Sequence, residues 1–175
     1  MAEDKPTYSL AARCAAEAVG TFTIVAGGCG AVSAARYAGG PPIAASAFAG
    51  SVMIGVYTTG SVSGAHLNPA VTAALLFGVN AIVDPELGAP PQAAPFLIGS
   101  VVGLLIFVTG PVSGCGMNPA RDVGPRLVTL LASGPSSALG PSPAWTYTLG
   151  PVLGAIVGST AFSAFKSVLH AKPDA

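Results

Sequence analysis

Charged side chains are scarce in this chain. Asp, Glu, Lys and Arg make up 8 % of the 175 residues, and hydrophobic residues make up 51 %. A soluble domain carries about 25 % charged residues, so this composition leaves too few polar side chains to cover a core in water. We therefore expect a single membrane domain. The formal net charge is zero, and no nucleic-acid partner is implied.

Residues for metal, redox or nucleophilic chemistry are also scarce. Cys14, Cys29 and Cys115 stand at unrelated spacings, and the chain has two histidines. These residues predict neither a disulfide framework nor a metal site. We see no nucleophile–base pair in the sequence, so we expect neither an enzyme nor a cofactor. The first ten residues lack a basic segment followed by an apolar run, and we do not expect a cleaved signal peptide.

Long apolar runs are what the chain does contain. A helix needs about 20 mostly apolar residues to cross the hydrocarbon core of a bilayer. We expect four crossing helices, at residues 10–36, 43–62, 96–110 and 145–166, of which the third, at fifteen residues, is marginal. Residues 80–95 hold two acids and four prolines and should form a cytoplasmic loop.

The positive charges indicate an orientation. Lys5, Arg13, Lys166 and Lys172 lie near the two ends of the chain, and only Arg36 lies in the loop after the first apolar run. Basic residues accumulate on the cytoplasmic side of membrane proteins. We therefore expect both termini in the cytoplasm, as an even number of crossings requires.

One short motif occurs twice. Residues 60–70 read "GSVSGAHLNPA" and residues 110–120 read "GPVSGCGMNPA", identical at seven of eleven positions. Asn is a favoured N-cap and Pro is favoured at the first helical position, so each Asn-Pro-Ala predicts a helix start. The apolar segments that follow, residues 68–79 and 118–132, are too short to cross a bilayer. Irregular backbone at membrane depth is tolerated only where it is buried in protein or lines a wet cavity.

Two such half-helices entering from opposite faces would meet near the middle of the membrane. Their positive dipole ends would then point at one place and oppose a cation or hydronium. A neutral solute could accept hydrogen bonds from Asn68 and Asn118. The sequence therefore predicts a pore for neutral solutes, with acceptors supplied by the carbonyls of Gly64, Ala65, His66, Gly114 and Gly116.

These motifs resemble a known family. "SGAHLNPAVT" and "GCGMNPARDVGPRL" resemble the two signature loops of the major intrinsic proteins, the aquaporins and glycerol facilitators. "CAAEAVGTFTIV" is similar to the family's first helix, whose buried acid matches Glu17. Asp122 and the "GPRL" after it resemble the aquaglyceroporin branch. The resemblance covers almost the whole chain and implies an inverted repeat, a plasma-membrane location, and passage of glycerol, water and other small neutral solutes such as urea.

The resemblance also implies roles for single residues. Phe48, Ile106, Cys115 and Arg121 match the constriction that acts as selectivity filter. The family usually has a smaller residue at the position of Ile106, whereas Cys115 replaces a bulkier aromatic, which suits a broad filter. Glu17 should accept hydrogen bonds from loop N–H groups, and Asp122 should pair with a neighbour such as Arg126. The pore corners are Asn68, Pro69, Ala70, Asn118, Pro119 and Ala120.

The spacing of the two motifs departs from the family. Relatives have six spans and well over a hundred residues between the two Asn-Pro-Ala corners, whereas here the offset is fifty. By this comparison the third span and most of the fourth are missing. We therefore expect an all-α membrane fold, an aquaporin-like inverted repeat reduced to four transmembrane helices plus two re-entrant half-helices.

This departure leaves the function open between alternatives. The first is a channel, as a homo-oligomer or together with full-length homologous subunits. The second is a truncated isoform or incomplete gene product that does not conduct and instead associates with or retains full-length subunits. A weaker third is a proton-coupled transporter that uses Glu17, since acids within a membrane span are often functional.

Overall fold

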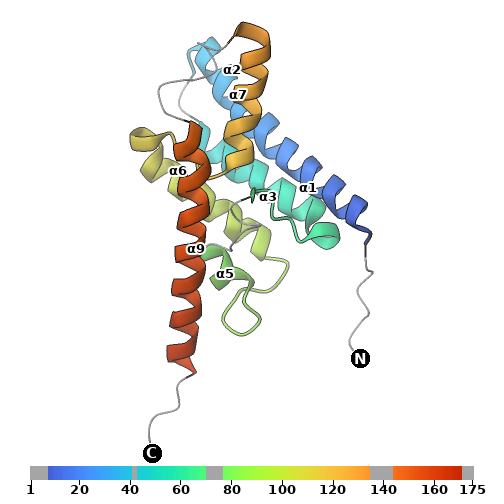
Figure 1. The fold of residues 1–175 in the computed structure, drawn as a ribbon, viewed down its shortest axis with the longest axis vertical. Coiled ribbons are helices and arrows are strands. Elements are labelled where there is room, and N and C mark those ends of the chain that lie inside the picture. The colour runs from blue at the N-terminus through green and yellow to red at the C-terminus, as the bar shows by residue number, and fades with distance from the viewer. Residues whose placement is uncertain (1–7, 41–42, 70–76, 135–143, 171–175) are drawn as a thin grey trace, which may run out of the picture.

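The computed structural model describes residues 8–40, 43–69, 77–134 and 144–170, and all regular elements within them are helices. The first run is made of α1 (Leu10–Ile24), the π-helical turn η1 (Val25–Cys29) and α2 (Gly30–Ala38). It is followed by α3 (Ala44–Ser63), α5 (Phe77–Val83), α6 (Ala94–Ser113), α7 (Pro119–Ser133) and α9 (Ala144–Leu169) (Figure 1). The expectation of an all-α membrane fold is confirmed.

Three helices in the described residues are long and apolar enough to cross a membrane: Leu10–Ala38, Ala94–Pro111 and Trp145–Leu169. The helix α3, which we expected to be a fourth crossing, has 20 residues, enough for about 30 Å. It does not reach the hydropathy of the other three because serine, threonine and glycine alternate with its apolar residues. The crossing by α3 therefore stays a prediction.

Two element boundaries differ from those expected from the sequence. The chain remains helical to Val83 and turns at residues 84–93, so the loop is shorter than residues 80–95. Asp84 is disfavoured in a helix because Pro85 follows it. The next helix begins at Ala94 rather than residue 96, because Pro95 lies in the first turn, where proline is tolerated. Continuing to Ser113, α6 has 20 residues and is not marginal in length.

The core forms where α3 packs between α1 and α6. Ile24, Phe48, Val52, Ala65 and Leu67 make up its buried cluster. Close packing depends on glycines: a Cβ at Gly20 would overlap Leu67, and a Cβ at Gly28 would overlap the Phe48 ring.

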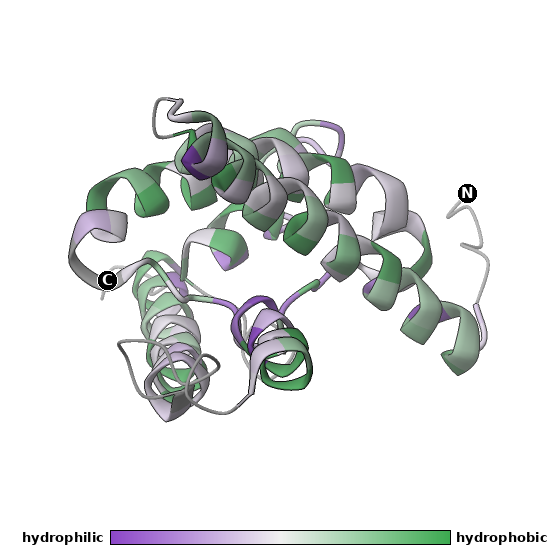
Figure 2. Cartoon of the chain, turned by 90° about the horizontal axis from the view of Figure 1, so that it is seen from above, coloured by the Kyte–Doolittle hydropathy of each residue, from purple (hydrophilic) through white to green (hydrophobic). Residues whose placement is uncertain are grey.

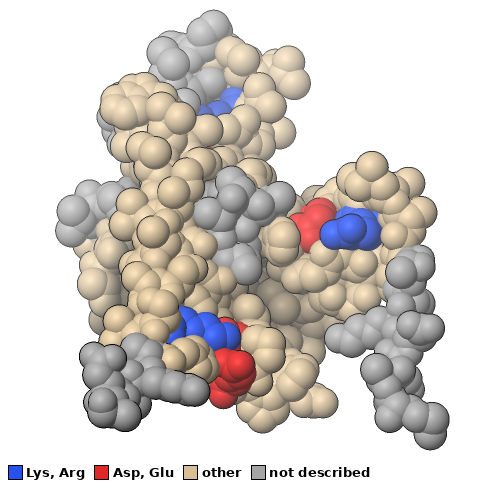
Figure 3. Space-filling view, turned by 60° about the horizontal axis from the view of Figure 1, so that its bottom comes forward, with Lys and Arg blue, Asp and Glu red and all other residues tan. Residues whose placement is uncertain are grey.

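The outer surface is apolar, as expected for contact with lipid. Large side chains such as Phe22, Leu131 and Val157 are 71 %, 87 % and 68 % exposed. Hydrophobic residues lie along the outer helices in the view from above (Figure 2). On the face drawn in Figure 3, charged atoms lie in a few small groups.

Candidate functional site

The two Asn-Pro-Ala corners meet and exchange hydrogen bonds. Asn68 Nδ2 donates to the carbonyl oxygen of Met117 over 3.0 Å, and Asn118 Nδ2 donates to the carbonyl oxygen of Leu67 over 2.8 Å. Each asparagine thus binds the residue that precedes the other asparagine. The contact joins positions about fifty residues apart and brings the repeated motifs to one place.

At the second corner, Asn118 also caps a helix. Its Oδ1 accepts hydrogen bonds from the backbone N–H groups of Ala120 and Arg121 at 3.0 and 3.3 Å. Pro119 occupies the first helical position of α7, where its missing N–H costs nothing. The positive end of the α7 dipole therefore points at the junction of the corners. Asn68 and Pro69 lie at the equivalent first corner, while Ala70 and most of the first half-helix lie outside the described residues.

The backbone that approaches each corner is irregular. Gly64, Ala65 and Leu67 have φ of 90°, 50° and 52°, and Gly114 and Cys115 have φ of 69° and 51°. Left-handed backbone costs a residue with a Cβ about 1–2 kcal/mol, so the surroundings must hold these conformations. In both approaches the left-handed backbone starts at the glycine that ends a long helix, α3 at Gly64 and α6 at Gly114.

Glu17 holds the first approach in place. Its Oε1 accepts the N–H of His66 at 2.9 Å and its Oε2 accepts the N–H of Leu67 at 2.6 Å. The Ser63 hydroxyl oxygen accepts the N–H of Ala65 at 3.1 Å. Three successive backbone N–H groups of the loop therefore bind side-chain oxygens, although this segment is not helical.

Phe48 and Arg121 lie against each other. The guanidinium carbon of Arg121 is 4.6 Å from the centroid of the Phe48 ring, within cation–π range. Phe48 and Cys115 are both buried, at 3 % and 5 % exposure. Ile106 is partly buried and packs against the cluster that contains Phe48.

Within α7, Asp122 is paired with Arg126, whose Nε lies 2.8 Å from Asp122 Oδ2. The Arg126 guanidinium carbon also lies 5.8 Å from the centroid of the Tyr147 ring. The same ring covers Gly116, where a Cβ would overlap it. Tyr147 therefore joins α9 to the second approach.

Sequence reasoning missed three residues of this site. No sequence motif marks Tyr147, because its contact with the second approach depends on how α9 packs. Leu67 and Met117 could have been found, since each directly precedes an asparagine of the repeat. In the part of the chain that is described, no three His, Cys, Asp or Glu residues come together as a metal site would require.

Comparison with known proteins gives one family. The family model described as "Major intrinsic protein" matches residues 5–83 and 72–162. Aquaporin-9 of Homo sapiens is 26 % identical over an alignment of 254 positions, covering 95 % of this chain and 86 % of the relative. The "Probable aquaporin NIP-type" of Nicotiana alata is 27 % identical over 220 positions, covering 87 % and 77 %.

Aquaporin Z of Bradyrhizobium diazoefficiens is 36 % identical over 117 positions, covering 62 % of this chain and 44 % of the relative. The chain thus spans less than half the length of one of these relatives and most of the length of the other two. The two longer alignments have more positions than the 175 residues of this chain. Both relatives therefore contain residues with no counterpart here.

Proposed function

Because this chain belongs to the major intrinsic protein family, we propose that it is a channel-class membrane protein for the passive transport of glycerol, water and small neutral solutes. The chain is an integral membrane protein. The observation that carries the proposal is the pair of reciprocal hydrogen bonds between the two Asn-Pro-Ala corners.

The junction of the corners has the chemistry of a pore that admits neutral molecules. The positive end of α7 points at it, which opposes cations and hydronium. An asparagine amide has two N–H donors, and one donor of Asn118 is used on Leu67. We assign the second N–H of the Asn118 amide to the hydroxyl oxygen of a passing solute. Carbonyl acceptors along the path are supplied by Gly64, Ala65, His66, Gly114 and Gly116.

The selectivity filter in this proposal consists of Phe48, Ile106, Cys115 and Arg121. The contact between Arg121 and Phe48 supports it, because a cation held against an aromatic wall is placed to repel ions and to bind hydroxyl oxygens. The small Cys115 side chain favours a filter wide enough for glycerol or urea. Asp122 and the "GPRL" that follows favour the aquaglyceroporin branch.

Glu17 has a structural role in this proposal. Both of its carboxylate oxygens accept backbone N–H groups, so they are occupied in holding the first approach. This arrangement favours a support over a proton relay, and the proton-coupled transporter is the less favoured reading.

We further propose that the chain lacks the third span and most of the fourth span of its family. The support is the offset of fifty between the corners and the relatives' alignments, which are longer than the chain. Without these helices one wall of the pore would face lipid, where each unpaired backbone polar group costs several kcal/mol. We therefore expect this chain alone to conduct poorly. A non-conducting form that associates with or retains full-length subunits is the second candidate function.

The test compares two proteins in vesicles. The first is this chain purified alone, and the second carries a family-like third and fourth span inserted between Val79 and Asn80. Stopped-flow light scattering measures water and glycerol flux per protein. We expect flux near background for the first and clear glycerol flux for the second. Equal flux would show that the shorter form builds a working pore, and flux from neither would contradict the channel assignment.

A further inference from the structure

The two approaches to the corners are supported in different ways. In the first approach, the carboxylate of Glu17 accepts the N–H groups of His66 and Leu67. In the second approach, the N–H of Met117 donates to the carbonyl oxygen of Cys115 over 2.9 Å. Leu67 and Met117 are equivalent positions of the repeat, since each directly precedes the asparagine of its corner. The same position is therefore supported by a carboxylate in the first approach and by a tight turn of the loop itself in the second.

The ring of Tyr147, in the first turn of α9, covers the second approach. Gly116 is buried, and a Cβ added there would overlap this ring. A Cβ added at Gly114 would lie 3.9 Å from the Tyr147 hydroxyl oxygen. Cys115, between the two glycines, is 5 % exposed. The position equivalent to Gly116 in the first approach is His66, so only the second approach has the bare backbone that lets a ring lie directly against it.

Tyr147 also contacts the helix that follows the second corner. The guanidinium carbon of Arg126 lies 5.8 Å from the centroid of the Tyr147 ring, within cation–π range. Arg126 is held by its ion pair with Asp122, which directly follows Arg121 in the chain. The ring therefore contacts both sides of the second corner, the approach before it and α7 after it.

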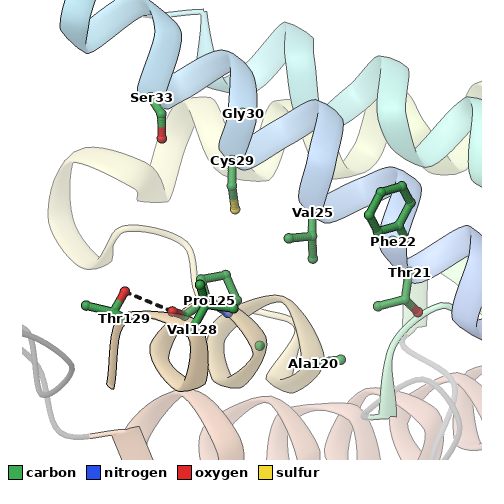
Figure 4. Close-up of a pocket in the computed structure, with 11 residues that line it drawn as sticks. Thr21, Phe22, Val25, Cys29, Gly30, Ser33, Ala120, Pro125, Val128 and Thr129 are labelled. Carbon is green, nitrogen blue, oxygen red and sulfur yellow. Dashed lines mark hydrogen bonds between the residues drawn. The ribbon is translucent and has the colours of Figure 1, made fainter. Parts of the chain in front are cut away.

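Another face of α7 borders an apolar groove of about 600 Å³ toward the first helical run (Figure 4). From α7 the groove is lined by Ala120, Gly124, Pro125, Val128 and Thr129. Figure 4 shows Val25 and Cys29 of the first run pointing across it toward α7. Arg126 is not among the lining residues and contacts α9 through Tyr147 instead. Because space remains on the side of the first run, packing of α9 against α7 is needed to hold the start of this helix.

We propose that Tyr147 is a positioning residue for the second half of the selectivity filter. Its ring holds the approach at Gly116, and with it Cys115, while its contact with Arg126 holds the helix that carries Arg121. Ring packing thus does for the second approach what a carboxylate does for the first. The role in selectivity rests on the proposed function of the chain, whereas the positioning of the loop can be tested without any flux.

The first test measures how fast the Cys115 thiol reacts in the full chain in detergent micelles. Cys14→Ser and Cys29→Ala leave Cys115 as the one thiol of this parent protein, and a methanethiosulfonate reagent labels it. We expect Tyr147→Ala to label about tenfold faster than the parent, because a buried thiol reacts only when its surroundings open locally. Tyr147→Phe keeps the ring and should label at the parent rate. A parent rate in Tyr147→Ala, or equally fast labelling of both variants, would overturn the proposal.

Phe162→Ala is the matched control on the same helix. Phe162 is 7 % exposed, and its ring packs against Phe77 rather than against the second approach. This variant should lower the midpoint of thermal unfolding and leave the labelling rate of Cys115 at the parent value. If it accelerates labelling as much as Tyr147→Ala does, the cause is a general loosening of α9 and Tyr147 has no specific role.

A double-mutant cycle tests the contact between the ring and Gly116. Gly116 is not among the residues with positive φ, so Gly116→Ala adds no left-handed strain and acts through the overlap with the ring. In the parent it should speed labelling of Cys115 and lower the unfolding midpoint. In Tyr147→Ala the overlap is gone, and the same change should have a much smaller effect. Equal effects in the two backgrounds would show that the positions are not coupled and would contradict the proposal.

Flux adds the link to selectivity. In whichever vesicle protein conducts, Tyr147→Ala should change the ratio of glycerol to water flux, whereas Phe162→Ala should change both fluxes together. Faster labelling in Tyr147→Ala with flux from neither vesicle protein would contradict the proposed function and still support the positioning of the loop. Unchanged labelling in a protein that conducts would overturn this inference and leave the proposed function intact.

Discussion

At the scale of single residues, the candidate site is held by side chains that bind backbone groups of a distant segment. Asn68 and Asn118 bind carbonyls across the junction, and Glu17 binds N–H groups of the first approach. Left-handed backbone at Ala65, Leu67 and Cys115 persists because the surroundings over-determine it. The loops can therefore be irregular and still be held in place.

Replacing Glu17 tests this support. Glu17→Ala leaves two backbone N–H groups without their acceptor, each costing about 1–3 kcal/mol when buried. We expect a lower midpoint of thermal unfolding in detergent micelles, and a smaller drop for Glu17→Gln, which keeps one acceptor oxygen. A midpoint for Glu17→Ala equal to that of wild type would mean that other contacts hold the loop.

The contact between Phe48 and Arg121 gives a test of selectivity, made in whichever form of the chain conducts. Phe48→Ala removes the buried ring beside the guanidinium and should raise permeability to polyols larger than glycerol. Arg121→Ala removes the cation and should allow ions to leak. In vesicles, light scattering measures the permeability to polyols and an ion-sensitive dye measures the ion leak. Unchanged selectivity in a conducting double mutant would remove both residues from the constriction.

At the scale of elements, the turn after α5 is tied to the C-terminal end of α9. Lys166 Nζ lies 2.8 Å from Asp84 Oδ2 and 3.2 Å from Glu86 Oε2, and His170 Nε2 lies 3.0 Å from Glu86. The Phe77 ring packs edge-on against Phe162 with centroids 5.5 Å apart. These contacts fix α9 against the element that follows the first corner.

The pH dependence of stability should report the ion pair between Asp84 and Lys166. The Lys166 ammonium, together with N–H groups of Glu86 and Leu87, lowers the pKa of Asp84 from 3.8 to about 2. A carboxyl whose pKa is lower in the folded state stabilises the fold fully above its unfolded pKa, and this contribution disappears as pH falls through about 2. We expect wild type to lose stability between pH 4 and pH 2.

Asp84→Asn isolates that contribution, because asparagine keeps an acceptor oxygen but carries no charge. Its unfolding midpoint should fall less than that of wild type between pH 4 and pH 2, and the two should differ most near neutral pH. Glu86→Gln is the matched control, since it removes another acid of the cluster and keeps Asp84. Parallel curves for wild type and Asp84→Asn would show that the ion pair does not contribute.

At the scale of the whole molecule, the surface is that of a protein surrounded by lipid and other helices. Large apolar side chains are exposed on α1, α6, α7 and α9, while charged atoms lie in small groups on the face drawn in Figure 3. In water such a surface would aggregate. In a bilayer the same surface is compatible with lipid.

Topology is the prediction that belongs to this scale. From the even number of proposed crossings and the basic residues near both ends we predict that both termini lie in the cytoplasm. Tags at residue 2 and residue 174 should therefore react with membrane-impermeant reagents only after the cytoplasmic side is opened. Tags on opposite sides would contradict four crossings and would fit the three helices that meet the length and hydropathy criteria.

Local signals in the sequence predicted much of the fold. The apolar runs, the Asn-Pro helix start at Asn118 and the repeat of the corner motif depend on interactions within a few residues, and the all-helical membrane fold follows from them. Local reasoning was less accurate at the ends of elements. It placed the start of α6 at residue 96, because the tolerance for Pro95 depends on its being in the first turn.

The tertiary structure decided how these local pieces meet. The sequence indicates that Asn68 and Asn118 start helices, but only packing of α3 against α1 and α6 brings their amides to Leu67 and Met117, about fifty residues away. The contact of Tyr147 with Gly116 likewise arises only when α9 packs beside the second approach. The physical reason is that a helix cap forms with residues next to it in the chain and an apolar run meets lipid without a partner. A hydrogen bond between the two corners forms only where packing brings two distant segments together.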